Sequence, residues 1–307
     1  MTYLVTGATG LVGSAVVRLL LSQGLEVTGV SSKDADLTDR DETFQLISDT
    51  QPKVLVMAAA KVGGIIANQK DPVGFLSRNL QIQTNLLDAA HTFNIEKVVF
   101  LGSSCIYPRD STQPILEESL LTGPLEPTNA PYALAKISGL QLVEAYRRQF
   151  GHSWISLMPT NLYGPNDNFD LESSHVLPAL LRRFHEAQAQ EKKEVTLWGT
   201  GTATREFLHV DDLARAILHC IKFYDEKIPL NVGTGLETSV KNLALSIAQI
   251  VGYSGEIKWD RNKPDGTPRK VLSVKRINDI GWRSSIDLET GIKQTYEWFK
   301  EYQRRSD

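Results

Sequence analysis

Three glycines near the start of the chain constrain its fold more than any other feature. Gly7, Gly10 and Gly13 follow directly on the apolar run Tyr3–Thr6 and open the amphipathic segment Leu11–Gln23. Glycines also serve ordinary turns, so the signal comes from their place between a strand and a helix. A helix that begins there presents free N–H groups and a positive partial charge, both of which suit a diphosphate.

Each glycine of this turn has its own physical reason. Gly7 allows a tight turn, Gly10 has no Cβ and lets a diphosphate approach the backbone, and Gly13 lets the helix pack close to the sheet. The turn therefore predicts a dinucleotide-binding site at the beginning of the chain.

The first half of the chain alternates apolar strands with amphipathic helices. After the turn, we expect strands at Glu26–Val30, Val54–Met57, Lys97–Leu101 and Ser153–Met158, and helices at Val73–Phe93 and Tyr132–Phe150. Short apolar strands separated by helices predict an α/β fold with a doubly wound, Rossmann-like parallel sheet that is covered on both faces.

The second half of the chain shows a different pattern of predicted elements. We expect helices at His175–Ala187, Asp211–Phe223, Lys241–Val251 and Leu288–Tyr302, a strand at Val195–Trp198, and an exposed or ligand-facing loop at Lys263–Pro268. We therefore predict a dinucleotide-binding domain at residues 1–160 and a smaller, irregular α/β substrate-binding domain at 161–307. Segments near 205–235 are expected to return to the first domain.

Composition excludes several classes of protein. The 307 residues include 33 Lys and Arg against 36 Asp and Glu, a net charge of −3, which lacks the basic excess of a nucleic-acid binder. No apolar run approaches the length of a membrane span. Two cysteines exclude a disulfide scaffold and, with a strand starting at residue 3, predict a cytoplasmic protein without a signal peptide. No His, Cys and Asp cluster has metal-ligand spacing, so we expect no metal.

Tyr132 and Lys136 are the clearest candidates for proton transfer. Their i, i+4 spacing on a helix places a phenol and an ammonium on one face. We expect the ammonium of Lys136 to lower the pKa of Tyr132, so that the phenol can exchange a proton with an alcohol oxygen during hydride transfer. Such pairs are also common on helix surfaces, and it is the upstream glycine turn that favours a catalytic role.

The segment Ser103-Ser104-Cys105 follows the apolar run Val98–Leu101. That places it at the carboxyl end of a strand, where ligands bind in open parallel sheets. Ser103 can donate a hydrogen bond to a carbonyl oxygen and share a developing oxyanion with Tyr132. Ser104 taken alone is typical of a loop.

The end of the second strand bears on which dinucleotide is bound. An NAD site usually has an acidic residue there for the adenosine ribose, whereas this strand ends at Val30 and is followed by Ser31, Ser32 and Lys33. Two hydroxyls and an ammonium favour a 2′-phosphate, hence NADP(H), although Lys33 could be a solvated loop residue and Asp34 weakens the argument. At Asp36-Leu37, slightly further on, a carboxylate could accept a hydrogen bond from the adenine amino group.

Together, the glycine turn, Ser103 and the Tyr132/Lys136 pair resemble the extended short-chain dehydrogenase/reductase family. The resemblance runs from about residue 2 to residue 300 and includes the segments 58–65, 101–108, 126–129, 159–165, 198–201, 205–212 and 263–270. These look like the branch that converts GDP-4-keto-6-deoxy-D-mannose to GDP-L-fucose with NADPH, by epimerisation at C3 and C5 and then reduction of the C4 ketone.

The resemblance also implies individual catalytic roles. Cys105 is expected to be the base and His175 the acid of epimerisation, while Ser103 and Tyr132 hold the enolate oxygen and Tyr132 later protonates the C4 alkoxide. Lys136 would tune Tyr132 and bind the cofactor ribose. A lone cysteine after a strand is often merely a small core residue, and His175 at a helix start could belong to a cap.

The remaining site residues are expected from the same resemblance. For the cofactor they are Gly7, Thr9, Gly10, Leu11, Val12, Gly13, Ser32, Lys33, Asp36, Leu37, Ala58, Ala60, Leu101, Gly102, Ser104, Lys136, Pro159, Asn161, Leu162 and His175. For the GDP-sugar they are Arg183, Trp198, Arg205 and Asp265. Arg suits a diphosphate, but Arg183 could lie on a solvated helix face and Trp198 could be core.

The chain departs from the family pattern at two positions, and the resemblance also implies an oligomeric state. Some members carry an arginine within the first glycine turn, where this chain has Thr9, and arginine is also missing after the second strand. Both differences bear on the 2′-phosphate. The family commonly pairs through two long helices, so a homodimer is expected.

Two other functions compete with this interpretation. A 4-epimerase or a 4,6-dehydratase of the same family would keep bound NAD, but a dehydratase usually has an acidic residue near the position where this chain has Cys105. A dinucleotide sensor without chemistry should have lost Tyr132 or Lys136, and both are present.

If Lys33 contacts a 2′-phosphate, its removal should act on one cofactor only. Lys33→Ala is expected to raise the Kd for NADPH about tenfold and to leave the Kd for NADH nearly unchanged, because only NADPH carries the extra phosphate. Fluorescence titration with both cofactors measures the two constants. Equal effects on both would remove Lys33 from the phosphate site.

Overall fold

The computed structural model describes residues 1–263 and 265–306. The loop predicted at Lys263–Pro268 includes Pro264, which lies outside the described residues. The other residues of that segment form neither helix nor strand up to β12 (Arg269–Lys270), in agreement with the prediction.

A six-stranded parallel sheet forms the centre of the molecule. Its order is β2 (Val27–Val30), β1 (Tyr3–Thr6), β3 (Val54–Met57), β4 (Lys97–Leu101), β5 (Ile155–Pro159) and β9 (Leu230–Val232). The order reverses between β1 and β3, so the carboxyl ends of these two strands border a crevice. The predicted doubly wound fold is confirmed.

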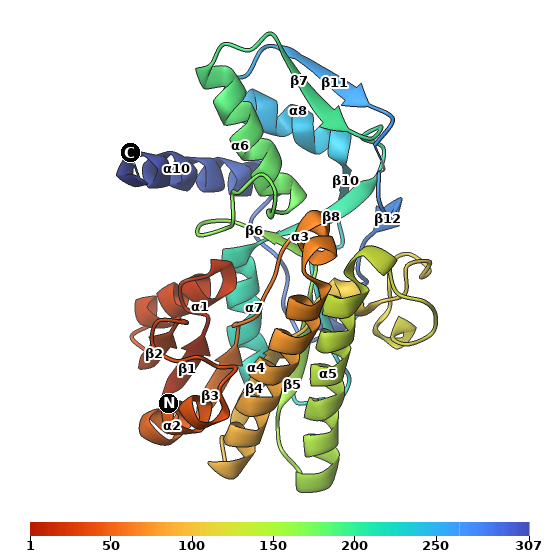
Figure 1. Ribbon diagram of the computed structural model, residues 1–307. Coiled ribbons are helices and arrows are strands. Elements are labelled where there is room, and N and C mark those ends of the chain that lie inside the picture. Colours follow the sequence, from red (N-terminus) through yellow and green to blue (C-terminus); the bar gives the residue numbers. More distant parts are fainter. Residues whose placement is uncertain (264, 307) are drawn as a thin grey trace.

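Successive residues of each strand face opposite layers of helices. Val5, Val56 and Val99 pack under α1 (Leu11–Ser22) and α7 (Val210–Phe223), which lie side by side in Figure 1. Their neighbours in sequence face α2 (Arg40–Thr50), α4 (Pro72–Thr92) and α5 (Ala130–Phe150) on the other side. Apolar residues on both faces of every strand are what a covered parallel sheet requires.

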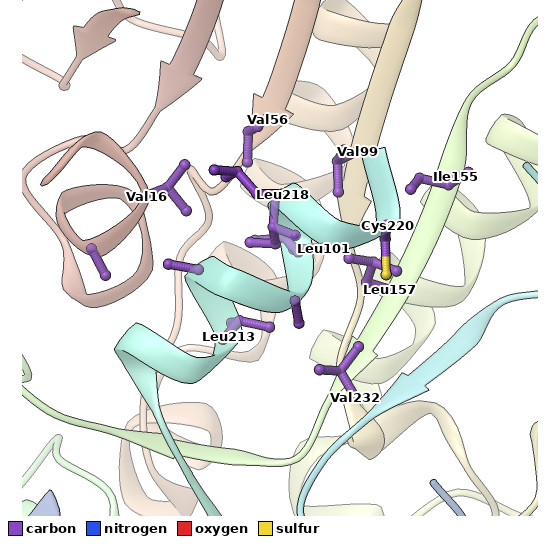
Figure 2. Packing of buried hydrophobic residues seen from close by; sticks show 14 of the residues in the cluster. Val16, Val56, Val99, Leu101, Ile155, Leu157, Leu213, Leu218, Cys220 and Val232 are labelled. Carbon is purple, nitrogen blue, oxygen red and sulfur yellow. The ribbon is translucent and has the colours of Figure 1, made fainter. Parts of the chain in front are cut away.

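Cys220 belongs to the first of these two layers. Its side chain lies in the hydrophobic cluster beside Ile155 and Leu157 (Figure 2), and it is fully buried. Burial raises the pKa of the Cys220 thiol to about 12, so this cysteine is an inert core residue.

A smaller part is built over the carboxyl end of the sheet (Figure 1). Its helices are α6 (Val176–Ala189), α8 (Val240–Val251) and α10 (Leu288–Ser306), and its strands are β6 (Asn161–Tyr163), β7 (Glu194–Trp198), β8 (Thr204–His209), β10 (Glu237–Ser239), β11 (Glu256–Asp260) and β12. All of these elements except β10 and β12 contribute to a separate apolar core, and the short helices α3 (Ile65–Lys70) and α9 (Lys275–Asp279) lie outside it. In the part of the chain described, no helix combines the length and apolarity needed to span a membrane.

Most predicted helices and strands lie within about two residues of the observed ones, while α10 continues four residues beyond the predicted end at Tyr302. The elements that were not predicted are α2, α3, α9 and several short strands. The helix α2 was not expected because only Thr43 and Ile47 of its side chains are buried, which leaves no apolar stripe. Its start is set instead by the side chain of Asp39, which accepts a hydrogen bond from the backbone N–H of Glu42. The strands β8 and β12 were also not predicted from the sequence.

The buried carboxylate of Glu206 on β8 joins the two parts. Its Oε1 accepts hydrogen bonds from the backbone N–H groups of Thr234 (2.6 Å) and Gly235 (2.7 Å), just after β9, and its Oε2 accepts from Leu272 (2.8 Å). Burial raises the pKa of Glu206, while these three N–H groups oppose that change. The backbone carbonyl of Glu206 also accepts from the side chain of Asn161 (2.7 Å), after β5.

Removal of this carboxylate should be costly. Glu206→Ala is expected to lower the free energy of unfolding by about 3 kcal/mol, because three buried N–H groups lose their acceptor. Glu237→Ala, which removes a largely surface carboxylate paired with Arg269, is the matched control and should cost at most about 1 kcal/mol. Urea unfolding measures both, and equal losses would contradict the role given to Glu206.

Candidate active site

The glycine turn has the geometry expected of a phosphate cradle. Gly7 has a φ of +69°, and a Cβ there would lie 2.8 Å from the backbone nitrogen of Ala59, at the end of β3. A Cβ on Gly13 would lie 2.1 Å from the carbonyl oxygen of Gly7. No side chain caps α1 at Gly10, so the first N–H groups of this helix remain available to an anion.

Two further loops adjoin this turn. The backbone N–H of Ala59 donates to the hydroxyl of Thr6 (3.2 Å), which fixes the loop after β3 against β1. Asn166 donates to the hydroxyl of Ser14 (3.1 Å), so the loop after β6 lies against the start of α1. The structure thus brings together loops that follow β1, β3 and β6 around one helix N-terminus.

The residues after β2 are accessible at the outer end of the crevice. The carboxylate of Asp34 accepts hydrogen bonds from the backbone N–H and the hydroxyl of Ser31, both at 2.8 Å, and is thereby turned back onto the loop. Ser32 and Lys33 are exposed. Asp36 uses Oδ1 to accept from the hydroxyl (2.7 Å) and backbone N–H (2.9 Å) of Thr38, next to the buried Leu37.

Ser103, Tyr132 and Lys136 meet at the carboxyl end of β4. The hydroxyl of Ser103 lies beside the phenol of Tyr132, where it acts on the pKa of that phenol as a hydrogen-bond partner. The ammonium of Lys136 donates to the carbonyl oxygen of Leu101 (2.8 Å) and lies 5.8 Å from the centre of the Tyr132 ring. Phe75 of α4 contacts that ring edge-on, with centroids 6.3 Å apart, and so holds its orientation.

The expected lowering of the Tyr132 pKa by Lys136 is wrong. Burial raises the pKa of Tyr132 above its ordinary value, and the neighbouring Cys105 adds to this, while only the hydrogen bond with Ser103 opposes it. Burial also lowers the pKa of Lys136 to about 8. Burial therefore disfavours the charged form of both groups, and among the described residues no carboxylate is paired with the Lys136 ammonium.

Cys105 lies beside this pair and is half-buried. Its Sγ accepts a hydrogen bond from the side-chain amide of Asn129 (3.3 Å), and the ammonium of Lys270 lies 3.6 Å away. These residues line a hollow at the surface together with Arg109, Glu126 and others. The alternative that Cys105 is a core residue is therefore wrong.

His175 immediately precedes α6 and faces the solvent. Its side chain makes no capping hydrogen bond, so a capping role does not explain it. The imidazole is water-accessible, yet the surrounding protein lowers its pKa by desolvation and Lys270 lowers it further by repulsion. The backbone N–H of Gly64 donates to the carbonyl oxygen of Ser173 (2.8 Å), which ties the approach to His175 to the loop after β3.

Three of the four residues predicted to contact the GDP-sugar adjoin the turn between β7 and β8. Trp198 is 53% exposed with the ammonium of Lys263 over its ring, so the alternative that it is core is wrong. The carboxylate of Asp265 accepts from the backbone N–H (2.7 Å) and hydroxyl (2.8 Å) of Thr200 and thereby shapes that turn. Burial lowers the pKa of Arg205, and the carboxylate of Asp265 opposes that shift.

The other predicted residues occupy strand ends or loops of the same face. Arg183 lies on α6, where its guanidinium donates to the carbonyl oxygen of Thr196 (3.3 Å). Leu11 and Val12 begin α1, Ala58 and Ala60 follow β3, Gly102 and the buried Ser104 follow β4, Pro159 ends β5, and Asn161 and Leu162 lie on β6. Thr9 is exposed within the glycine turn.

Sequence reasoning missed two polar residues that contact Cys105. Asn129 lies in the segment 126–129 and Lys270 in the segment 263–270, both of which carried the family resemblance without a role being assigned to either. Lys270 is 165 residues away from Cys105 along the chain. Spacing alone offers no signal for such a contact.

A parallel sheet with a glycine turn at its switch point, and a Ser–Tyr–Lys group beside it, defines a dinucleotide-dependent enzyme of the Rossmann class. The family model described as "NAD dependent epimerase/dehydratase family" matches residues 3–233. The chain belongs to this family, whose cofactor is a nicotinamide dinucleotide. The predicted membership of the extended dehydrogenase/reductase group is thereby confirmed.

Individual relatives cover nearly all of the chain. It is 50% identical to the probable GDP-L-fucose synthase 1 of Oryza sativa, over 97% of this chain and 91% of the relative. It is 47% identical to the GDP-L-fucose synthase of Escherichia coli, over 98% and 97%. Among solved structures, the GDP-L-fucose synthetase of Naegleria fowleri bound to NADP has a TM-score of 0.90 at 30% identity, over 99% of this chain and 95% of that one.

The burial of the Lys136 ammonium should make the free energy of unfolding depend on pH. Its pKa falls from an ordinary 10.5 to about 8, so between these values the unfolded chain binds more protons than the folded one. The free energy of unfolding contributed by this group should therefore rise as the pH rises from 8 to 10.5, by at most about 3.4 kcal/mol.

Lys136→Met removes the titrating group and is expected to remove this rise, which denaturant unfolding at several pH values measures against the wild type. Lys293→Met, at an exposed lysine on α10, is the control and should retain the wild-type slope. A slope unchanged in Lys136→Met would show that Lys136 titrates normally.

Proposed function

We propose that this protein converts GDP-4-keto-6-deoxy-D-mannose to GDP-L-fucose, by epimerisation at C3 and C5 followed by reduction at C4 with NADPH. The names of the relatives support this activity. The observation that carries it is the placement of a thiol, Cys105, beside the hydrogen-bonded hydroxyls of Ser103 and Tyr132. A reductase alone needs the hydroxyls and has no use for an adjacent base.

One carbonyl explains how a single site can perform both steps. The C4 ketone acidifies the C–H bonds of its two neighbours, C3 and C5. Ser103 and Tyr132 can donate to the C4 oxygen while it carries negative charge as an enolate, and Tyr132 can later give its proton to the C4 alkoxide. The raised pKa of Tyr132 suits this role, since the phenol keeps its proton until a stronger base forms.

The residues present fit the proposed cofactor. The cradle at Gly7 and Gly13, which a Cβ would fill, and the uncapped N-terminus of α1 suit a diphosphate. The accessible Ser32 and Lys33 suit a 2′-phosphate, and Lys136 suits the nicotinamide ribose. When bound, NADPH supplies the hydride that reduces C4.

The GDP end of the substrate is assigned to the turn between β7 and β8. Arg205 matches a diphosphate, and the exposed indole of Trp198 offers a face for a base. Arg183 and Asp265 complete this group. We also propose a homodimer through α4 and α5, which expose Val73 and Phe150, in the cytoplasm.

Two variants should separate the two steps. Cys105→Ser is expected to slow solvent deuterium entry at C3 and C5 about a hundredfold while reduction of an already epimerised ketone survives. Tyr132→Phe is expected to abolish reduction with little change in the Kd for NADPH. Tyr146→Phe, on the same helix but bonded to Asp88 (2.6 Å), is the control and should behave as wild type.

The readouts are NADPH absorbance, NMR of the sugar protons and identification of the product. GDP-L-fucose formed with one NADPH consumed per molecule supports the proposal. Absence of that product from the wild-type enzyme, or unchanged deuterium entry in Cys105→Ser, would refute it.

A further inference from the structure

Among the described residues that contact the sulfur of Cys105, Lys270 is the one that carries charge. Its Nζ lies 3.6 Å from Sγ, while the uncharged amide of Asn129 occupies another side of the sulfur at 3.3 Å. An ammonium at this distance favours a thiolate over a thiol by direct attraction, and an amide donor adds to it. The thiolate is the form of cysteine that can remove a proton from carbon.

The backbone around Lys270 is firmly held. Lys270 pairs with Arg205 in the register between β12 and β8, and the two following residues are buried. The N–H of Val271 donates to the side chain of Gln113 (2.9 Å), and the N–H of Leu272 donates to Glu206 (2.8 Å). The side chain of Lys270 therefore reaches Cys105 from a strand whose backbone is held by hydrogen bonds.

Other cationic groups also face this hollow, and each of them is paired with a carboxylate, unlike Lys270. Arg109 lies 3.7 Å from the carboxylate of Glu126, and Arg269 is paired with Glu237 at 2.8 Å. Tyr107, Tyr132 and His175 are the other titratable groups that the structure places near the thiol or Lys270, and none of them carries a negative charge at neutral pH. Within the described ranges, no carboxylate lies within 4.0 Å of the Lys270 ammonium.

We infer that Lys270 is a positioning residue of the epimerase step, whose ammonium favours the thiolate of Cys105. The inference depends on the proposed function, because a base is needed only for epimerisation.

The contact bears on the removal of a proton from carbon. While Cys105 is a thiolate, the ammonium of Lys270 neutralises its charge. When the C–H bond breaks and the S–H bond forms, the electron pair of the C–H bond moves to the C4 oxygen. That electron pair returns from the oxygen as His175 gives its proton to the same carbon from the opposite face. Solvent afterwards removes the proton from Cys105 and returns one to His175.

The reactivity of Cys105 tests this inference in the ligand-free enzyme. Alkylation by iodoacetamide, a neutral reagent, is followed at pH 7.5 by mass spectrometry of the Cys105 peptide. Lys270→Met is expected to react about tenfold more slowly than wild type, and Lys270→Arg within about twofold of it. Lys275→Met, which removes an exposed charge five residues away, is the control and should react as wild type. The buried Cys220 should stay unmodified throughout.

A second measurement separates positioning from ligand contact. NMR titration of the His175 imidazole, assigned with His175→Asn, should give a higher pKa in Lys270→Met than in wild type, because the repulsion that lowers it is gone. Equal alkylation rates in wild type and Lys270→Met would overturn the inference. So would weaker GDP-sugar binding with unchanged alkylation, since Lys270 would then only contact the ligand. Failure to form GDP-L-fucose would refute the proposed function and leave the alkylation result intact.

Discussion

The hydrogen bond from the Lys136 ammonium to the carbonyl oxygen of Leu101 is the contact on which the catalytic geometry depends. It joins α5 to the last residue of β4 inside the protein, where water cannot replace it. Tyr132 lies one helical turn before Lys136, and Ser103 lies two residues after Leu101. A single contact between helix and strand therefore sets the distance between the two hydroxyls that hold the C4 oxygen.

The site lies where two differently built parts of the chain meet. The parallel sheet provides rigid strand ends, and the smaller part supplies cations on β8 and β12 and an imidazole at the start of α6. Glu206 holds these together by accepting backbone hydrogen bonds from segments on either side of it. This explains why a buried carboxylate, costly in itself, is found next to Arg205 on the same strand.

The sequence was sufficient for features that are local. The glycine turn, the alternation of strands and helices, and the i, i+4 spacing of Tyr132 and Lys136 each follow from neighbouring residues, and the described fold agrees with them. The pKa of Tyr132 could not be predicted, because it depends on how deeply α5 is buried. The contact of Lys270 with Cys105 joins a two-residue strand to a distant turn, and no periodic pattern in the sequence predicts it.

The central claim is that one C4 oxygen, held at one place, serves two inversions and one reduction. The most direct test is the isotope pattern of the product formed by the wild-type enzyme in D₂O with unlabelled NADPH, read by NMR. The account predicts deuterium at both C3 and C5 and protium at C4. Deuterium at only one of the two epimerised carbons, or solvent deuterium at C4, would contradict it.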